Sequence, residues 1–313
     1  NRLPILFLPG DTYANRMPDP VLQQVEHFNN PGITANDAFK PVTRYFDRIT
    51  RPEQIIQSFP AAVQTMLDPA DCGPACISLS QDIQGQTFDY PEDFFKEKIH
   101  TIRRPRPDEF QIKEAAEKIK SSKNPIIISG GGVFYSNAME ELSKFAIKHN
   151  IPVTQTVMGY STMKRDHSHY AGQIGGLGGK NTNSLAKQTD LAIAVGTKLG
   201  DFTTGSWANF ENENFKLVSI NVSRFDANKH LAQAVIGDAK VSLDELSQAL
   251  GEWKANEEWN KKSQAELKSW NEHVDKESAP TNQEVPSYVQ VVGAVYRNSD
   301  PSDIAVTAAG GLV

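Results

Sequence analysis

The 313-residue sequence contains only two cysteines, Cys72 and Cys76, and this scarcity excludes a disulfide-stabilised secreted scaffold. Two thiols in a chain of this length are typical of a reducing, cytoplasmic compartment, where we expect the protein. A zinc site would need two further ligands at suitable spacing, and the nearest histidines, His27 and His100, form no ligand pair. We therefore expect no metal ion to be held by residues of this chain.

The sequence also lacks an excess of basic residues and a long apolar run. Its 32 Lys and Arg residues against 38 Asp and Glu residues give a net charge of -6, which argues against a nucleic-acid-binding protein. No apolar stretch approaches the roughly 20 residues that cross a bilayer. A charged fraction of 22% and a hydrophobic fraction of 39% are typical of a folded globular chain, so neither nucleic acid nor a membrane is expected as a partner.

Short apolar runs alternate with helical stretches along most of the chain. Strands are predicted at residues 4–8, 75–79, 125–129, 151–156, 191–195, 215–222 and 303–307. Helices are predicted at residues 108–121, 137–149, 181–188 and 285–297, and one or two helices are predicted within residues 238–276. This alternation indicates an α/β fold with a parallel sheet covered on both faces, and such sheets bind ligands at the carboxyl ends of their strands.

Two local signals mark boundaries in the N-terminal third. Residues 50–53 read TRPE, a capping box in which Thr50 accepts from a first-turn amide and Glu53 reaches back, so a helix is predicted from there to about Leu67. Residues 100–107 read HTIRRPRP, a basic, proline-bearing stretch without periodicity. Such a composition is typical of a linker between domains.

Two glycine-rich loops follow predicted strands. The first consists of Gly130, Gly131 and Gly132, and the second contains Gly175, Gly176, Gly178 and Gly179 beside Lys180. Glycine amides at a helix N-terminus can cradle a phosphate, but each loop is also open to interpretation as a tight turn or a close backbone contact with nothing bound. A NAD-binding fold places an acidic residue at the end of the next strand, and residues 154–156 (TQT) contain none, which argues against NAD.

Several segments occur in a characteristic order along the chain. They are residues 4–11 (PILFLPGD), 40–44 (KPVTR), 50–53 (TRPE), 73–82 (GPACISLSQD), 124–133 (NPIIISGGGV), 151–159 (IPVTQTVMG), 172–176 (GQIGG), 190–196 (DLAIAVG), 219–222 (SINV) and 303–311 (DIAVTAAGG). In this order they resemble the thiamine-diphosphate enzymes of the acetolactate-synthase group. The resemblance extends over essentially the whole chain.

The resemblance implies a Rossmann-like middle domain with a parallel sheet, flanked by partial thiamine-diphosphate-binding α/β domains. Residues 1–99 would be the C-terminal part of the pyrimidine-binding domain, followed by the linker at 100–107. Residues 108–280 would be the middle domain, and residues 285–313 would begin the diphosphate-binding domain. On this basis we expect the sequence to be a segment of a longer protein.

Other segments point to one activity within the group. Residues 8–12 (LPGDT), 18–24 (PDPVLQQ), 36–40 (NDAFK), 81–85 (QDIQG) and 201–204 (DFTT) resemble members that hydrolyse a carbon–carbon bond of a cyclic trihydroxy-1,2-diketone in myo-inositol catabolism, with 5-deoxy-glucuronic acid as product. The synthases carry Phe-Gln-Glu where this sequence has residues 39–41 (FKP), which argues against synthase chemistry. They carry Asp-Asp-Arg where it has residues 200–202 (GDF), which argues against a bound flavin.

Two alternatives to this activity stay open. An acetolactate-synthase-like or other 2-oxo acid enzyme would use the same cofactor on a different substrate. A non-catalytic nucleotide-binding module would use the middle domain alone. The inventory of products, or tight binding of ADP or flavin, would separate these hypotheses.

The resemblance also assigns roles to individual residues. Phe39 and Lys40 would lie near the thiazolium side of the active site, where the Lys40 ammonium would hold the polyhydroxylated substrate or the developing enolate. The alternative is a structural lysine at a domain interface. Gly310 and Gly311 would approach the cofactor diphosphate, and the two glycine loops would form a vestigial nucleotide pocket or shape the substrate channel.

The remaining catalytic parts of the family would lie outside the chain. Its activating Glu would precede Asn1, and its magnesium motif, a Gly-Asp-Gly stretch with an Asn, would follow Val313. We therefore expect this chain alone to be inactive. Because family enzymes bind thiamine diphosphate and magnesium between subunits, a dimer or tetramer is expected for the complete protein.

Overall fold

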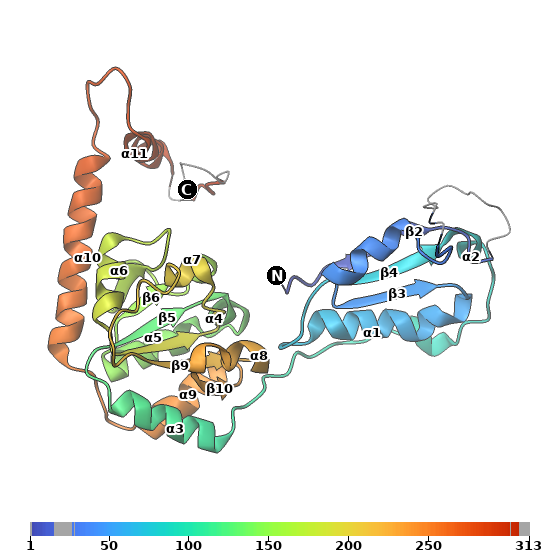
Figure 1. The fold of residues 1–313 in the computed structure, drawn as a ribbon, viewed down its shortest axis with the longest axis horizontal. Coiled ribbons are helices and arrows are strands. Elements are labelled where there is room, and N and C mark those ends of the chain that lie inside the picture. Colours follow the sequence, from blue (N-terminus) through green and yellow to red (C-terminus); the bar gives the residue numbers. More distant parts are fainter. Residues whose placement is uncertain (1, 16–26, 28, 301, 307–313) are drawn as a thin grey trace. The chain divides into compact units, whose positions relative to one another are not determined.

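The computed structural model describes residues 2–15, 27, 29–300 and 302–306, and its internal contacts divide the chain into two compact units. Unit 1 is Asn1–Arg103 and unit 2 is Arg104–Val313 (Figure 1). The division falls inside the segment predicted as a linker. Arg104 belongs to unit 2 because its guanidinium lies 3.0 Å from the Asp238 carboxylate, and the Asp238 amide donates to the Pro105 carbonyl at 2.8 Å.

Unit 1 is built on a parallel sheet with β4 (Ala75–Ser80) at its centre. One side of β4 pairs with β1 (Leu6–Phe7) and β2 (Gly10–Asp11), and the other side pairs with β3 (Tyr45–Ile49). Pro9 lies between β1 and β2, because proline has no N–H to donate to the ladder. The strand predicted at residues 4–8 is thus present only as β1, and β2 and β3 are elements that the sequence pattern did not predict.

Different elements cover the two faces of this sheet. Helix α1 (Ile55–Leu67) packs on one face, where Ala75 and Ile77 of β4 join the apolar core. The 3-10 helix η1 (Ala35–Val42) packs on the other face, where its Asn36 side chain donates to Ser78. Since successive strand residues point to opposite faces, the η1 face carries Cys76, Ser78 and the neighbours paired with them.

The start of α1 differs in detail from the predicted capping box. A 3-10 turn, η2 (Pro52–Gln54), precedes the helix, and its Gln54 side chain accepts from the amides of Thr50 at 2.6 Å and Arg51 at 2.8 Å. The predicted partner was Glu53, which is wrong. The capping group stands three residues after Arg51, so the cap begins one residue later than the TRPE pattern suggests. Two further short elements, α2 (Gln81–Gln84) and η3 (Glu92–Phe95), complete unit 1.

Unit 2 contains a six-stranded, all-parallel sheet in the order β10-β9-β8-β5-β6-β7. Its strands are β5 (Pro125–Ser129), β6 (Val153–Gln155), β7 (Tyr170–Gln173), β8 (Leu191–Val195), β9 (Lys216–Asn221) and β10 (Gln233–Ile236). The strand order reverses between β5 and β8, and in such sheets the ligand crevice lies at the carboxyl ends of the strands beside this point. The predicted Rossmann-like α/β fold is confirmed.

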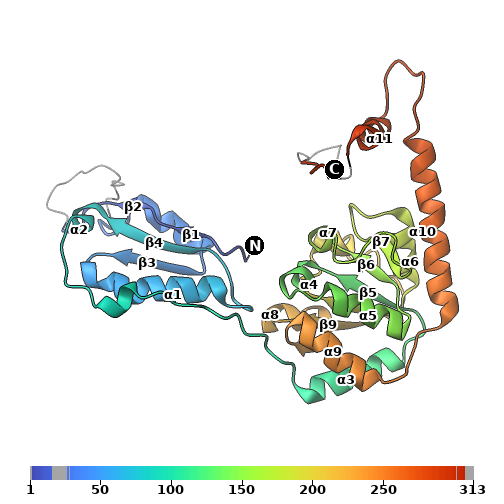
Figure 2. The same ribbon diagram turned by 180° about the vertical axis from the view of Figure 1, so that it is seen from behind.

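Helices cover both faces of the unit 2 sheet, as Figure 2 shows from behind. One face carries α3 (Glu109–Lys120), α5 (Met139–His149) and α9 (Ala239–Leu250), and the other carries α6 (Lys180–Gln188) and α10 (Glu257–Glu277). The apolar run of β5 serves both layers, because Ile127 joins the first core and Ile126 and Ile128 join the second. Short elements that follow strands β5, β6, β8 and β9 are α4 (Gly131–Tyr135), η4 (Val157–Gly159), α7 (Asp201–Thr204) and α8 (Arg224–Ala227), and η5 (Lys229–Leu231) precedes β10.

Of the two elements predicted for the C-terminal region, the helix is present and, in the residues that the structure describes, the strand is not. Helix α11 (Tyr288–Asn298) occupies the predicted helix at 285–297. The strand predicted at 303–307 is wrong for its described part, because residues 303–306 form no strand and Ile304 and Val306 are about nine-tenths exposed. An extended segment needs a neighbouring strand for its backbone groups, and none pairs with it among the described residues. Among all the residues that the structure describes, no helix is both long enough and apolar enough to cross a membrane.

Candidate functional site

A polar network lies on the η1 face of the unit 1 sheet, toward the carboxyl ends of its strands. It consists of seven side chains that come from four separate stretches of the sequence, namely Asp11, Thr34, Asn36, Asp37, Lys40, Arg48 and Ser78. The carboxyl end of a parallel sheet is where α/β folds place functional groups. We call this set the η1 network.

Asp11 is the buried anion of the network, with a side chain only 1% exposed. Its Oδ2 accepts from Arg48 Nε at 2.7 Å and from the Ser78 hydroxyl, and its Oδ1 accepts from the Thr12 amide at 2.8 Å. Burial acts to raise the pKa of Asp11, but these hydrogen bonds outweigh burial and lower the pKa below its ordinary value. Asp11 is therefore a fixed negative charge that anchors Arg48.

Asp37 is the second anion, and it receives donors at both carboxylate oxygens. Oδ2 accepts from the Thr34 amide at 2.7 Å, within a capping box, and from Arg48 Nη2 at 2.8 Å. Oδ1 lies 2.6 Å from Lys40 Nζ. Burial opposes ionisation, but the bonds from Lys40, the Thr34 amide and Arg48 lower the pKa of Asp37 to about 2.

Arg48 connects the two anions. Its Nε faces Asp11 while Nη2 reaches both Asp37 and the Thr34 hydroxyl, the latter at 2.9 Å. The ring of Phe46 lies under both cations of the network, 5.1 Å from Lys40 Nζ and 5.9 Å from the Arg48 guanidinium carbon. Negative and positive side chains alternate in the order Asp11, Arg48, Asp37, Lys40, so the four charges sum to zero. Arg48 makes the two more buried ion pairs, one with each aspartate.

The structure brings the two sequence-predicted residues Phe39 and Lys40 onto this same face. The Phe39 ring packs edge-on against Phe7 of β1, with ring centroids 4.6 Å apart. The Lys40 side chain is 53% exposed, and its ammonium forms an ion pair with Asp37. The role predicted for these two residues stays a prediction, and the structure adds the partners that hold them.

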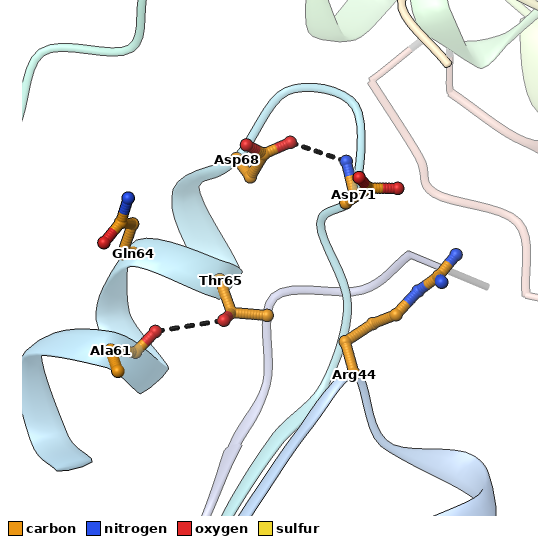
Figure 3. A pocket seen from close by; sticks show the side chains of 6 residues that line it. All are labelled: Arg44, Ala61, Gln64, Thr65, Asp68 and Asp71. Atoms are coloured by element: carbon orange, nitrogen blue, oxygen red, sulfur yellow. Dashed lines mark hydrogen bonds between the residues drawn. The ribbon is translucent and has the colours of Figure 1, made fainter. Parts of the chain in front are cut away.

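A pocket of about 390 Å³ lies elsewhere in unit 1, beside the C-terminal end of α1 (Figure 3). It is lined by Arg44, Ala61, Gln64, Thr65, Asp68 and Asp71. The Asp68 carboxylate accepts from the amides of Ala70 at 2.7 Å and Asp71 at 2.6 Å, so it closes the turn that follows the helix. None of the sequence-predicted site residues lines this pocket.

The first glycine loop lies at the switch point of the unit 2 sheet and packs directly on the loop after β8. The amides of Gly130 and Gly132 donate to the carbonyls of Val195 and Gly196, both at 2.9 Å. A Cβ at Gly130 would stand 2.5 Å from the Gly196 carbonyl oxygen, and one at Gly132 would stand 2.6 Å from the Gly196 Cα. Close backbone contact thus explains these two glycines, and a role of Gly131 and its neighbours in a nucleotide pocket stays a prediction.

The amides of the second glycine loop are likewise used inside the protein. Gly175 donates to Asn183 Oδ1 at 2.9 Å, and Gly176 donates to the Phe202 carbonyl at 2.7 Å. Gly178 and Gly179 donate to backbone carbonyls at 2.9 and 3.1 Å. An anion would have to compete with these bonds, so the loop is built for close packing, and its part in shaping a channel stays a prediction.

Two residues near the C-terminal end were predicted to approach the cofactor, and no metal ligand was predicted within the chain. Gly310 and Gly311 lie outside the described residues. Among the residues that the structure does describe, no group of three His, Cys, Asp or Glu side chains could hold a metal ion. The thiols of Cys72 and Cys76 are both free, and burial raises the pKa of each. We therefore assign no described residue to the cofactor diphosphate or to a metal ion.

The low pKa of Asp37 makes the stability of unit 1 depend on pH. Because the folded-state pKa of about 2 lies below the ordinary value of 3.8, ionised Asp37 stabilises the fold above about pH 4. This contribution, about 2 kcal/mol, is expected to disappear as the pH falls from about 4 to about 2. A carbon-13 NMR titration of the Asp37 carboxyl should show a midpoint near 2 that rises in Lys40→Met; a midpoint near 3.8 in the unaltered chain would contradict the network.

Comparison with known proteins identifies the family of unit 2. Residues 112–246 match the family described as thiamine pyrophosphate enzyme, central domain. Relatives among curated proteins include several named 3D-(3,5/4)-trihydroxycyclohexane-1,2-dione hydrolase. The one from Clostridium perfringens (strain 13 / Type A) is 48% identical over 250 residues, which are 80% of this chain and 39% of that protein.

Relatives with the same name occur in Bacillus. The protein of Bacillus velezensis is 46% identical over 271 residues, 85% of this chain and 42% of that protein. The protein of Bacillus subtilis (strain 168) is 47% identical over 246 residues, 79% of this chain and 39% of that protein. These alignments are longer than the central domain, so the similarity extends beyond it, and the chain spans about two fifths of the length of these relatives.

Proposed function

The chain belongs to the thiamine pyrophosphate enzymes, and from this premise we propose that it serves the hydrolytic opening of trihydroxycyclohexane-1,2-dione in inositol catabolism. The observation that supports the proposal is an identity of 46–48% to hydrolases of that name over about four fifths of the chain. The similar residues include some outside the central domain. This matters because proteins that share a fold differ in substrate through the residues of their sites.

The reaction needs a group that makes a carbon nucleophile, and thiamine pyrophosphate supplies that carbanion chemistry when bound. The same proposal has three further parts. Thiamine pyrophosphate is bound together with magnesium, the active protein is a homo-oligomer, and it works in the cytoplasm. The cytoplasm is proposed on the two free thiols, Cys72 and Cys76. No described residue is assigned to the metal or the diphosphate, so the tasks left to this chain are to bind and orient the substrate.

Lys40 is the residue of the η1 network best suited to such a task. Its ammonium is a compact positive charge with three donors, and half of its side chain is exposed, so it can reach a hydroxyl or a carbonyl oxygen of the substrate. A positive charge near a developing enolate oxygen stabilises it most when the charge is already in place. Phe39, packed on Phe7, would form an apolar wall beside it.

The proposal is tested with the purified gene product that contains this sequence. Trihydroxycyclohexane-1,2-dione is supplied with and without added thiamine pyrophosphate and magnesium, and the products are identified by NMR. We expect a ring-opened acid, 5-deoxy-glucuronic acid, whose formation depends on the added cofactor. Absence of ring opening under both conditions would refute the proposed function.

Replacing Lys40 by methionine is expected to lower the rate of ring opening at least about tenfold, because the charge that holds the substrate oxygen is lost while the side-chain volume is kept. Lys96→Met is the matched control. Lys96 also pairs with an aspartate three residues before it, Asp93, at 2.5 Å, but both partners are largely exposed. Equal rates for Lys40→Met and the unaltered enzyme would remove Lys40 from the site.

A further inference from the structure

The unusual feature of Lys40 is how firmly its anionic partner is held. Most surface pairs between residues three apart join two mobile side chains, and they contribute little because both must be ordered. Asp93 and Lys96 form such a pair, with side chains 82% and 70% exposed. Asp37, in contrast, is only 16% exposed and accepts from three donors, the Lys40 ammonium, the Thr34 amide and Arg48.

The position of Asp37 is in turn set from the interior of unit 1. Arg48 bonds Asp37 through Nη2 and the buried Asp11 through Nε, at 2.8 and 2.7 Å. The Thr34 amide fixes the same oxygen of Asp37 that Arg48 contacts, which turns the other oxygen toward Lys40. Two donors other than Lys40 therefore hold Asp37 in place.

The electrostatic consequence of Asp37 reaches beyond one ion pair. Arg48 and Lys40 are both cations, and both lie within 6 Å of the Phe46 ring centre. Without the negative charge between them, the two cations would repel each other across a partly buried space, and Lys40 would turn to solvent. Asp37 is thus the group that keeps the ammonium on the η1 face.

We propose that Asp37 is a positioning residue that places the Lys40 ammonium for the substrate, and that Arg48 fixes Asp37 for this purpose. The proposal rests on the function proposed above. It goes further, because it predicts that Asp37 influences the reaction through Lys40 and in no other way. An acidic residue that never contacts the substrate would then control the rate.

A double-mutant cycle on ring opening tests this dependence. Asp37→Asn keeps the shape of the side chain and an oxygen that can accept from the Thr34 amide, so the cap of η1 is preserved. In the otherwise unaltered enzyme we expect it to lower kcat/KM about tenfold. In the Lys40→Met background the same change should cost less than about twofold, since the ammonium that it positions is gone.

Two controls separate positioning from loss of structure. Asp93→Asn removes the matched exposed anion and should leave the rate unchanged. Nitrogen-15 NMR of the lysine ammonium groups should show Lys40 more ordered than Lys96, with the difference lost in Asp37→Asn. Equal rate losses from Asp37→Asn in both backgrounds, or unchanged Lys40 order, would overturn the positioning role while leaving the proposed function in place; an unaltered enzyme without ring-opening activity would instead overturn the proposed function.

Discussion

Replacing Arg48 by methionine is expected to lower the free energy of unfolding of unit 1 by about 3–5 kcal/mol. The change leaves Asp11, which is 1% exposed, as a buried charge without its counterion. It also removes one of the bonds that hold Asp37. Breaking one side of a buried ion pair costs far more than an exposed pair contributes, because the remaining charge keeps its desolvation penalty. Denaturant unfolding, followed by hydrogen exchange of the β4 amides, measures the loss.

Arg44→Met is the matched control for this change. Arg44 lies just before the same strand, β3, and its side chain makes no ion pair with any residue that the structure describes. We expect a loss within about 1 kcal/mol, as for an ordinary surface substitution. Adding Asp11→Asn to Arg48→Met should recover part of the lost stability, because the unpaired charge is then removed. Equal losses for the two arginine variants would show that the η1 network contributes no more than a surface contact.

Replacing Gly175 by alanine is expected to lower the free energy of unfolding of unit 2 by at least about 2 kcal/mol. Gly175 has a φ of +102°, a conformation that strains any residue with a Cβ, and the added methyl group would stand 2.0 Å from the Phe202 carbonyl oxygen. The loop would have to separate from α7 and break the bond from Gly176 to that carbonyl. Hydrogen exchange in β6 and β7 measures the effect.

Gly200→Ala provides the comparison within the same region. Gly200 precedes α7 with a φ of -67°, and a Cβ there would meet nothing within 4 Å. Its replacement should change stability by less than about 1 kcal/mol. If Gly175→Ala were equally mild, the second glycine loop would be open enough to move, and its amides could be freed for an anion.

The fold of unit 2 was predictable because its central strands are continuous apolar runs. Ile126, Ile127 and Ile128 are all fully buried, since β5 lies in the middle of the sheet and packs on both faces. The edge strands β7 and β10 were not predicted. Each has only four residues, YAGQ and QAVI, and a run this short does not signal a strand on its own.

The strand β3 of unit 1 was missed for a related reason. Its sequence, YFDRI, places Asp47 and Arg48 in the middle of the run, which lowers its apolar character. Arg48 can lie on a covered face only because Asp11 and Asp37 neutralise it there. That compensation exists only in the folded unit, so no pattern within five residues can reveal it.

The η1 network could not be predicted from the sequence, because its residues come together only in the folded unit. Lys40 and Phe39 were given a role by matching the family, whereas Asp11 and Asp37 lie in matched segments without an assigned role and Arg48 lies in none. Arg48 is separated from Asp11 by 37 positions, and only the pairing of β2 and β3 with β4 brings the two together. The glycine loops illustrate the reverse case, because their composition suggested an anion site while the structure uses their amides for packing.

The most direct test of the proposed activity is a competition assay on the gene product that contains this sequence. The enzyme receives trihydroxycyclohexane-1,2-dione and pyruvate together, with thiamine pyrophosphate and magnesium, and all products are identified in one NMR spectrum. The proposed function predicts that the cyclic dione is converted to a ring-opened acid while pyruvate remains. Acetolactate formed with the dione untouched would show a synthase, and consumption of neither substrate, with tight binding of ADP or flavin to residues 105–280, would show a nucleotide-binding module.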